Sequence, residues 1–393
     1  MEQWKEYKLG DVCYTISDTY KRNASEVVLI NTSDVLEGKC LNHSKTANKD
    51  LKGQFKKTFQ KDDILYSEIR PANKRFAYVD FDATDYIAST KLMVLRHNDK
   101  INPQYLFYIL KSKSVIEELQ MLAESRSGTF PQITFSELAN LSVNLPPLNE
   151  QQKILSILKS LDDKIELNRQ INDNLEQQAQ ALFKSWFVDF EPFKDGEFVD
   201  SELGMIPKGW RVGNIFDIAN IFDSQRKPLS SGQREKMDKI YPYYGATSCM
   251  DYVDNYIFDG IYTLIGEDGS VVRDNGLPFV QYVWGKFWVN NHAHILQGKN
   301  GFSTEMIYTF LATTNICHLV TGAVQAKLSQ ANMNKLYLPI PPENLAEKIK
   351  CIFDEIFKNK RLLIEEINTL TTIRDTLLPR LMSGELKINE INC

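Results

Sequence analysis

The stretch Leu138-Ala-Asn-Leu141-Ser-Val143-Asn-Leu145-Pro146-Pro147 returns 195 residues later, counted from Leu138 to Met333, as Met333-Asn-Lys-Leu336-Tyr-Leu338-Pro-Ile340-Pro341-Pro342. In both copies the apolar side chains alternate before the proline pair, which predicts a short strand that the prolines terminate. A period of this length is too long for a solenoid repeat and has the size of a domain. The sequence therefore predicts a chain built by internal duplication.

Each copy also opens with a tryptophan signature. The first is Trp4-x4-Leu9-x-Asp11-Val12, and the second is Trp210-x4-Ile215-x-Asp217-Ile218. Between opening and closing, the patterns predict strands at 27–31, 63–66, 91–96, 262–265 and 287–289, and helices at 105–111 and 304–313. This mixture predicts two globular α+β domains, at residues 1–145 and 208–340.

A long helix is predicted after each proline pair, in the segments 146–190 and 341–386. The first carries seam residues at heptad spacing: Ile154, Leu158, Leu161, Ile165, Asn168, Asn172, Leu175, Ala179, Leu182 and Trp186. The second keeps the same register: Ile349, Phe353, Ile356, Lys360, Leu363, Ile367, Leu370, Arg374, Leu377 and Leu381. Forty helical residues span about 60 Å. Ordinary structural packing would also produce amphipathic helices. The same heptad register after both Pro-Pro pairs, however, favours duplication.

Breaks in the pattern complete the predicted organisation. The segment 191–207 is rich in Pro, Gly and acidic residues, which indicates a linker without regular structure. Pro379 lies inside the second heptad pattern and predicts a kink or an end near Leu378. Gly384 is placed to cap that helix, and residues 387–393 form a tail.

Composition limits the class of protein. The 393 residues are 43% hydrophobic and 25% charged, which fits globular domains with at least two cores. No apolar run approaches the ~20 residues of a membrane span. The six cysteines are scattered and form no C-x-x-C pair, which predicts neither disulfides nor zinc and favours a cytoplasmic location.

The net charge of −5 hides an uneven distribution. Residues 146–200 carry 6 Lys and Arg against 11 Asp and Glu, whereas residues 1–145 carry 20 against 19 and residues 201–340 carry 12 against 12. The acidity is therefore concentrated near the first long helix. The two large segments are compatible with nucleic-acid binding if their cations gather on one face.

Catalytic motifs are missing from the sequence. There is no G-x-x-x-x-G-K-[ST] motif for ATP, and neither proline pair forms the Asn-Pro-Pro-aromatic motif of amino-methyltransferases. His292-Ala-His294 hints at a metal site, but no third ligand has convincing spacing. We therefore expect no catalytic residue, no metal and no cofactor bound by this chain.

Two related but different domains on rigid helices suit a ligand with two recognition elements. DNA with a divided site is such a ligand, because the spacing of domains maps onto the spacing of half-sites. Since the two copies differ in sequence, the predicted target is asymmetric.

Several segments resemble the specificity subunits of type I restriction-modification systems. Gln151-Gln-Lys-Ile-Leu and Ala181-Leu-Phe-Lys-Ser-Trp-Phe-Val-Asp-Phe-Glu-Pro resemble the two ends of that family's central helical region. The family's distal helical region is resembled by Leu377-Leu-Pro-Arg-Leu-Met-Ser-Gly-Glu-Leu. A target recognition domain of the family is resembled by two segments, Tyr243-Tyr-Gly-Ala-Thr and Gly260-Ile-Tyr-Thr-Leu-Ile-Gly-Glu-Asp-Gly. The segment Glu343-Asn-Leu-Ala-Glu-Lys-Ile departs from the family pattern at the second helix entrance.

The resemblance implies more than the residues do. Residues 1–145 and 208–340 would each be a target recognition domain that reads half of a bipartite double-stranded DNA site. The central helical segment 146–190 and the distal one 341–386 would pack antiparallel with pseudo-twofold symmetry, set the spacer and dock two methyltransferase subunits. Restriction (translocase-nuclease) subunits would join this core. S-adenosylmethionine, ATP and Mg²⁺ would belong to the partner subunits, with no membrane involved.

Candidate contact residues follow from the chemistry of DNA recognition, in which Arg and Lys bind guanine or phosphate and Asn and Gln bind adenine. The lysine-rich stretch 45–61 predicts phosphate attraction, although a solvated face is an equal alternative. The predicted DNA contacts are Lys21, Arg22, Lys56, Lys57, Arg70, Asn73, Lys74, Arg75, Arg126, Gln225, Arg226, Lys227, Tyr244, Thr247, Gln325 and Lys327. The predicted partner-binding helix positions are Leu161, Ile165, Asn168, Asn172, Leu175, Leu182, Trp186, Ile356, Leu363, Ile367, Leu370 and Leu377.

Two hypotheses of other classes stay open at this point. One is a coiled-coil adaptor that binds only proteins. The other is a stand-alone nuclease with unrecognised acidic residues.

Overall fold

The computed structural model describes residues 4–49, 51, 53–125, 131–322 and 325–386. The chain divides into two compact units, one of Met1–Glu166 with Asn368–Cys393 and the other of Leu167–Ile367. Each unit holds one globular part, which we call domain 1 (residues 4–145) and domain 2 (residues 208–340), and one segment of each long helix. Arg126, Lys52 and the tail 387–393 lie outside the described residues.

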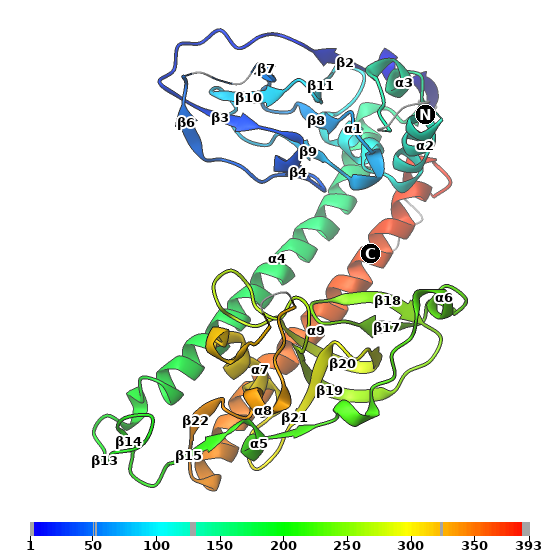
Figure 1. The fold of residues 1–393 in the computed structure, drawn as a ribbon. Helices are drawn as coiled ribbons and strands as arrows, with labels where there is room; N and C mark the ends of the chain where they lie inside the picture. Colours follow the sequence, from blue (N-terminus) through cyan, green and yellow to red (C-terminus); the bar gives the residue numbers. More distant parts are fainter. Residues whose placement is uncertain (1–3, 50, 52, 126–130, 323–324, 387–393) are drawn as a thin grey trace. The chain divides into compact units, whose positions relative to one another are not determined.

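Domain 1 contains two four-stranded sheets (Figure 1). The first has the antiparallel order β2 (Cys13–Ile16), β11 (Leu92–His97), β8 (Ile64–Ser67) and β9 (Phe76–Tyr78). The second has the order β6 (Lys45–Ala47), β3 (Glu26–Ile30), β10 (Tyr86–Ser89) and β7 (Phe55–Lys57), with β3 and β10 parallel. The short strands β4 (Val35–Leu36) and β5 (Lys39–Cys40) form a hairpin, and the helices are α1 (Pro103–Leu110), α2 (Lys113–Glu124) and α3 (Phe135–Ala139).

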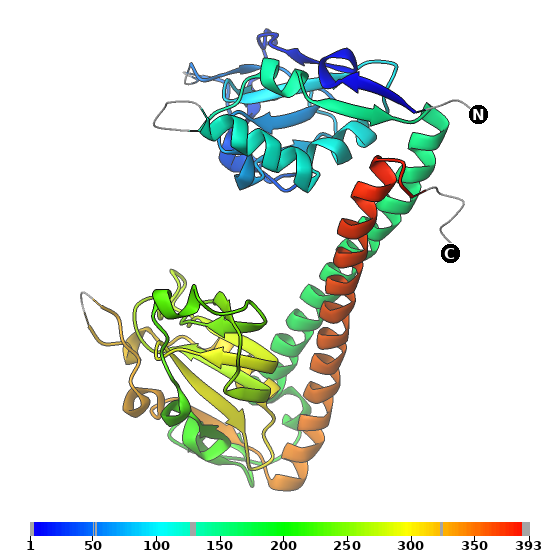
Figure 2. The same cartoon turned by 90° about the vertical axis from the view of Figure 1, so that its right-hand side faces the viewer.

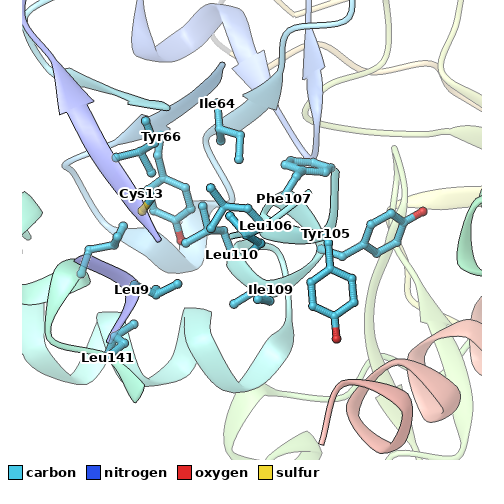
Figure 3. Packing of buried hydrophobic residues seen from close by; sticks show 14 of the residues in the cluster. Leu9, Cys13, Ile64, Tyr66, Tyr105, Leu106, Phe107, Ile109, Leu110 and Leu141 are labelled. Atoms are coloured by element: carbon cyan, nitrogen blue, oxygen red, sulfur yellow. The ribbon is translucent and has the colours of Figure 1, made fainter. Parts of the chain in front are cut away.

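The main core of domain 1 lies where α1 meets the first sheet. Figure 3 shows Tyr66 and Cys13 from the sheet facing Leu106 and Leu110 of α1. Helix α1 begins here because the Asn102 side chain accepts hydrogen bonds from the first turn, 2.9 Å from the Gln104 nitrogen. Each large apolar side chain buried in this way contributes about 1.5–3 kcal/mol. Burial also raises the pKa of Cys13 to about 12, so this thiol serves packing.

Domain 2 is built on one six-stranded sheet. Its order is β16 (Ala219–Ile221), β21 (Ala293–Gly298), β19 (Phe258–Gly266), β20 (Val280–Val289), β17 (Tyr241–Tyr244) and β18 (Cys249–Val253), and β17 runs parallel to β20. The helices are α5 (Ile215–Ile218), α6 (Ser231–Arg234), α7 (Thr304–Thr313) and α8 (Gln330–Met333). Ser303 caps α7 by accepting a hydrogen bond from the Met306 nitrogen.

The backbone confirms the duplication. The strand after each tryptophan, β1 (Lys5–Lys8) or β15 (Arg211–Asn214), pairs antiparallel with the closing strand of its own copy, β12 (Ser142–Leu145) or β22 (Tyr337–Ile340). The residue after tryptophan faces the residue before Pro-Pro in both copies, as Lys5 opposite Leu145 and Arg211 opposite Ile340. The order β2-β11-β8-β9 of domain 1 also recurs as β16-β21-β19-β20 in domain 2.

The two long helices are α4 (Leu148–Phe187) and α9 (Glu343–Met382). Within the second unit, Glu176 forms an ion pair with Lys360, and the Asn168 amide donates to Glu366 at 2.9 Å. The later residue of α4, Glu176, contacts the earlier residue of α9, Lys360, so these segments run antiparallel (Figure 2). Within the first unit, Asp162 pairs with Arg374 at 2.8 Å in the same register. The predicted antiparallel helical arrangement is therefore confirmed within each unit.

One local prediction is wrong, the linker without regular structure, and of the predicted kink or end near Leu378 the end is wrong. Helix α9 continues through Pro379 to Met382, because Leu378 and Leu381 on either side are buried and hold the last turn in place. Gly384 then takes a φ of +75°, as a helix-ending glycine does. The segment 191–207 has regular structure, a turn η4 (Glu191–Phe193) and a hairpin of β13 (Phe198–Val199) with β14 (Ile206–Pro207). In the described part of the chain, no helix combines the length and apolar character needed to cross a membrane.

Candidate nucleic-acid interface

Two segments of domain 1 bring predicted cations together. The Tyr20 nitrogen donates to the Lys56 carbonyl at 2.8 Å, so the loop that carries Lys21 and Arg22 lies beside β7. Lys21, Arg22 and Lys56 are all exposed. Exposed ammonium and guanidinium groups at one place attract phosphate through a salt-dependent electrostatic effect.

Lys57 lies beside this group but points inward. Its Nζ donates to the carbonyls of Thr90 at 3.1 Å and Leu92 at 2.8 Å, and burial lowers its pKa. Its ammonium group therefore ties β7 to the start of β11. In this arrangement Lys57 supports the fold, and a DNA contact would require it to release both carbonyls.

The loop between β8 and β9 carries the strongest candidates in domain 1. A short turn, η3 (Pro71–Asn73), is flanked by Arg70 and Lys74, which both adopt left-handed backbone angles with φ of 46° and 51°. Such angles in non-glycine residues cost of order 1 kcal/mol each and are concentrated at functional sites. Arg70, Asn73 and Lys74 are exposed, so the strained turn presents two cations and an amide to solvent.

Contacts on both sides hold this loop in place. Lys74 pairs with Glu37 at 3.0 Å, and the Ala72 nitrogen donates to the Gln120 side chain at 3.0 Å. Arg75, predicted as a DNA contact, is half-buried, and its Nη1 donates to the Ser33 carbonyl at 3.1 Å. Arg75 is therefore engaged in supporting the loop, while Arg70 and Asn73 lie at its exposed tip.

Domain 2 presents a loop at the equivalent place. After β8, the Glu68 carbonyl accepts from the Ile133 nitrogen, and after β19 the Glu267 carbonyl accepts from the Leu328 nitrogen, both at 2.8 Å. In domain 1 the loop after β8 is therefore joined to the segment just before α3. In domain 2 the loop after β19 is joined to the segment just before α8. The loop pair 68–75 with 131–133 forms the candidate interface of domain 1, and the loop pair 267–279 with 325–328 forms that of domain 2. Arg126 belongs to the segment before α3 but lies outside the described residues.

Several predicted residues of domain 2 cluster at its loop pair. The Gly269 nitrogen donates to the Ala326 carbonyl at 3.0 Å, which brings Gln325 and Lys327 next to the 267–279 loop. Both side chains are exposed, and Lys327 Nζ lies 3.5 Å from Glu267. Gln325 and Lys327 are thus placed at the candidate interface.

Arg226 differs from its prediction. Its guanidinium, 14% exposed, donates to Glu267 at 2.5 Å and to the Ala293 carbonyl at 2.8 Å. Its neighbours Gln225 and Lys227 are exposed, and the Trp288 indole donates to the Lys227 carbonyl at 2.6 Å. Arg226 therefore anchors this turn from inside, and Gln225 and Lys227 are its outward-facing side chains.

Tyr244 and Thr247 lie at the turn between β17 and β18. Tyr244 is half-buried and packs edge-on against Phe287 with ring centroids 5.8 Å apart. Burial raises its pKa to about 12, and the Asn290 nitrogen donates to its carbonyl at 3.0 Å. Tyr244 is thus a packing residue in this structure, whereas Thr247 is exposed.

Arg273 was missed by the reasoning from sequence. It is exposed in the loop between β19 and β20, which corresponds to the loop of domain 1 that carries Arg70, and its guanidinium lies 5.3 Å from the Phe279 ring centroid. The missing signal was the equivalence of the two loops, because the nearest other Arg or Lys in the sequence is Lys286. We add Arg273 to the candidate contacts.

A group of potential metal ligands lies beneath the domain 2 loops. Among the described residues, ligand atoms of Asp223, Glu267 and His294 lie within 4.8 Å of one another. Burial raises the pKa of Asp223, but hydrogen bonds from His294 and Gln330 outweigh this, so the pKa lies below its ordinary value. The positive charge between these carboxylates is supplied by Arg226, whose guanidinium a metal ion would have to displace.

The predicted partner-binding positions on the helices are largely covered by the chain itself. Ile165, Asn168 and Asn172 are buried. The others are half-buried: Leu161, Leu175, Leu182, Trp186, Ile356, Leu363, Ile367, Leu370 and Leu377. Large apolar side chains on other faces of the helices are exposed, namely Leu148, Leu167, Ile171, Ile352, Leu362 and Ile373. The heptad spacing therefore predicted side chains that pack within this chain. The exposed apolar side chains on the other faces are better placed to contact a partner protein.

Comparison with known proteins identifies the family. The family model for the type I restriction modification DNA specificity domain matches residues 1–177 and 207–372. The specificity subunit of the type I restriction enzyme HindI from Haemophilus influenzae is 56% identical over 197 residues, which cover 49% of this chain and 43% of that protein. The specificity subunit of the type I restriction enzyme MjaIX from Methanocaldococcus jannaschii is 30% identical, over 75% of this chain and 71% of that protein.

A solved structure agrees in fold. The crystal structure of the type I restriction-modification system S subunit from M. genitalium matches with a TM-score of 0.55 and 18% identity, over 97% of this chain and 96% of that one. At this identity the likeness concerns the fold alone. Together with the two domain matches, it supports the duplicated arrangement of domains and helices. The chain belongs to the family of type I restriction-modification DNA specificity subunits.

Proposed function

We propose that the two domains each read one half of a bipartite, asymmetric double-stranded DNA site. The observation that carries this proposal is the loop pair that recurs at the same topological position in both domains. The loops differ in their side chains, with Arg70 and Asn73 in one and Arg273, Gln325 and Lys327 in the other. Because base readout depends on such side chains, the two halves of the target would differ in sequence.

We further propose that this chain performs no catalysis. Its role would be to place two methyltransferase subunits, and through them restriction (translocase-nuclease) subunits, on a chosen sequence in the cytoplasm. The exposed apolar side chains of α4 and α9, such as Leu167, Ile171 and Leu362, support docking along the helices. S-adenosylmethionine, ATP and Mg²⁺ would then be bound by the partner subunits.

The test is a footprint of the chain assembled with its methyltransferase subunits. The expected result is protection of a divided site, with two short blocks on either side of a stretch that tolerates any sequence. A complex that assembles but protects no DNA would support a protein-only adaptor instead. Cutting of DNA by the purified chain with Mg²⁺ alone would support a nuclease.

A further inference from the structure

Two loops of domain 2 meet at one buried histidine. His294, at the second position of β21, is 1% exposed. Its Nδ1 lies 2.5 Å from Asp223 Oδ2, and its Nε2 lies 2.7 Å from the Leu328 carbonyl. Asp223 begins the turn 223–227, and Leu328 ends the segment 325–328. One imidazole ring therefore joins the segment 325–328 of the candidate interface to the turn 223–227, which carries the exposed side chains of Gln225 and Lys227.

A third loop joins the same group. Glu267 is the first residue after β19, and its carboxylate lies 3.7 Å from His294 Nδ1 and 2.5 Å from Arg226 Nη1. Arg226 also holds the turn 223–227, because its Nε donates to the Asp223 carbonyl at 2.9 Å. The four side chains of Asp223, Arg226, Glu267 and His294 thus link all three loops from below, and we call them the buried network.

The polar atoms of the buried network bind one another and nearby backbone carbonyls. Both ring nitrogens of His294 are engaged, one with a carboxylate and the other with a backbone carbonyl. The Arg226 guanidinium lies between the two carboxylates, 3.6 Å from Asp223 and 2.5 Å from Glu267. These contacts indicate a structural link between the three loops.

We propose that the buried network positions the DNA-reading loops of domain 2, and that it sets how sharply this domain discriminates its half-site. This inference rests on the proposed function. Base readout requires side chains held within about 0.5 Å by supporting contacts, and the network supplies such support from beneath three loops at once. In the described part of domain 1, the strand position equivalent to His294 is occupied by Met93, which cannot form these hydrogen bonds.

The experiment uses the complete complex of this chain with its methyltransferase subunits. Binding is measured to the intact DNA site, to a site altered in the domain 2 half, and to one altered in the domain 1 half. His294→Leu should reduce the preference for the intact domain 2 half by about tenfold or more, the loss expected when reading groups become loosely held. The preference for the intact domain 1 half should stay unchanged. His294→Gln, which keeps an N–H donor, should recover part of the loss.

Controls separate positioning from a general loss of structure. His318→Leu changes an exposed histidine of the same domain and should leave both preferences intact. If His294→Leu fails to fold, Arg226→Lys decides, because it keeps the charge but removes the guanidinium, whose Nη1 reaches Glu267 and the Ala293 carbonyl and whose Nε reaches the Asp223 carbonyl. Folded variants that discriminate like the wild type, or that lose both preferences equally, would overturn this inference alone. A wild-type complex that binds no DNA would overturn the proposed function and this inference with it.

Discussion

Removal of the Asp162 carboxylate tests how domain 1 is fixed to the helices of its own unit. Asp162 of α4 accepts hydrogen bonds from Tyr108, from Lys111 at 2.9 Å and from Arg374 at 2.8 Å. Asp162→Ala would remove the carboxylate shared by Lys111 and Arg374, which are 18% and 23% exposed, and would leave Arg374 its pair with Asp375 at 2.7 Å. Breaking a fully buried pair costs 3–5 kcal/mol, and partial exposure reduces this, so we expect a loss of about 2–3 kcal/mol.

The loss should also depend on pH with a definite sign. Burial raises the pKa of Asp162, but Lys111, Tyr108 and Arg374 outweigh burial and bring the pKa below its ordinary value. A depressed folded-state pKa stabilises the fold above the unfolded pKa of about 3.9 and loses this effect as pH falls through the folded value. The difference between wild type and Asp162→Ala should therefore be full near neutral pH and shrink in acid.

Hydrogen exchange followed by mass spectrometry on the peptides of α1 and α2 measures the effect where it should arise. Asp163→Ala, which changes the exposed neighbouring carboxylate, is the matched control and should protect these peptides like the wild type. The double variant Asp162→Ala with Arg374→Ala should lose less free energy of unfolding than the sum of the two single variants. The expected coupling energy is about 1–2 kcal/mol. Equal protection in the Asp162 and Asp163 variants, or strict additivity, would refute this account of the contact.

Three further predictions concern DNA recognition. Arg70→Ala should weaken binding of the assembled complex by about 1–3 kcal/mol if the guanidinium contacts guanine, and unchanged affinity in a titration would remove Arg70 from the interface. Replacing residues 208–340 by the corresponding domain of a related subunit should change one block of the footprint, whereas a change in both blocks would contradict independent reading. Inserting four residues, about 6 Å of helix, into α4 should alter the gap between the blocks but leave their sequences the same, as selection from random DNA would reveal.

The duplication and the main elements were predictable because their signals are local in sequence. The Pro-Pro pairs and the alternating residues before them mark the closing strands, and heptad spacing marks α4 and α9. The end of α9 was not predictable, since buried packing of Leu378 and Leu381 overrides the disfavour of Pro379 for a helix. The pairing of β1 with β12 was not predictable either, because the repeat shows that both strands recur but not that they lie side by side.

The candidate site was only partly predictable for a different reason. A basic side chain looks the same in sequence whether it faces solvent or a buried acceptor. Arg226 meets Glu267, 41 residues further along the chain, and Lys57 meets carbonyls of β11 and of the residues just before it. Only the folded backbone brings these partners together, so the sequence could suggest candidate loops but not which of their cations face outward. Contact of the exposed residues with DNA stays a prediction.

Mapping methylated bases across the genome of a host that carries this chain with its partner subunits tests the central proposal most directly. We predict one asymmetric motif made of two short defined blocks, separated by a gap of constant length in which every base is tolerated. A single continuous motif, or methylation that does not depend on this chain, would contradict reading by two domains.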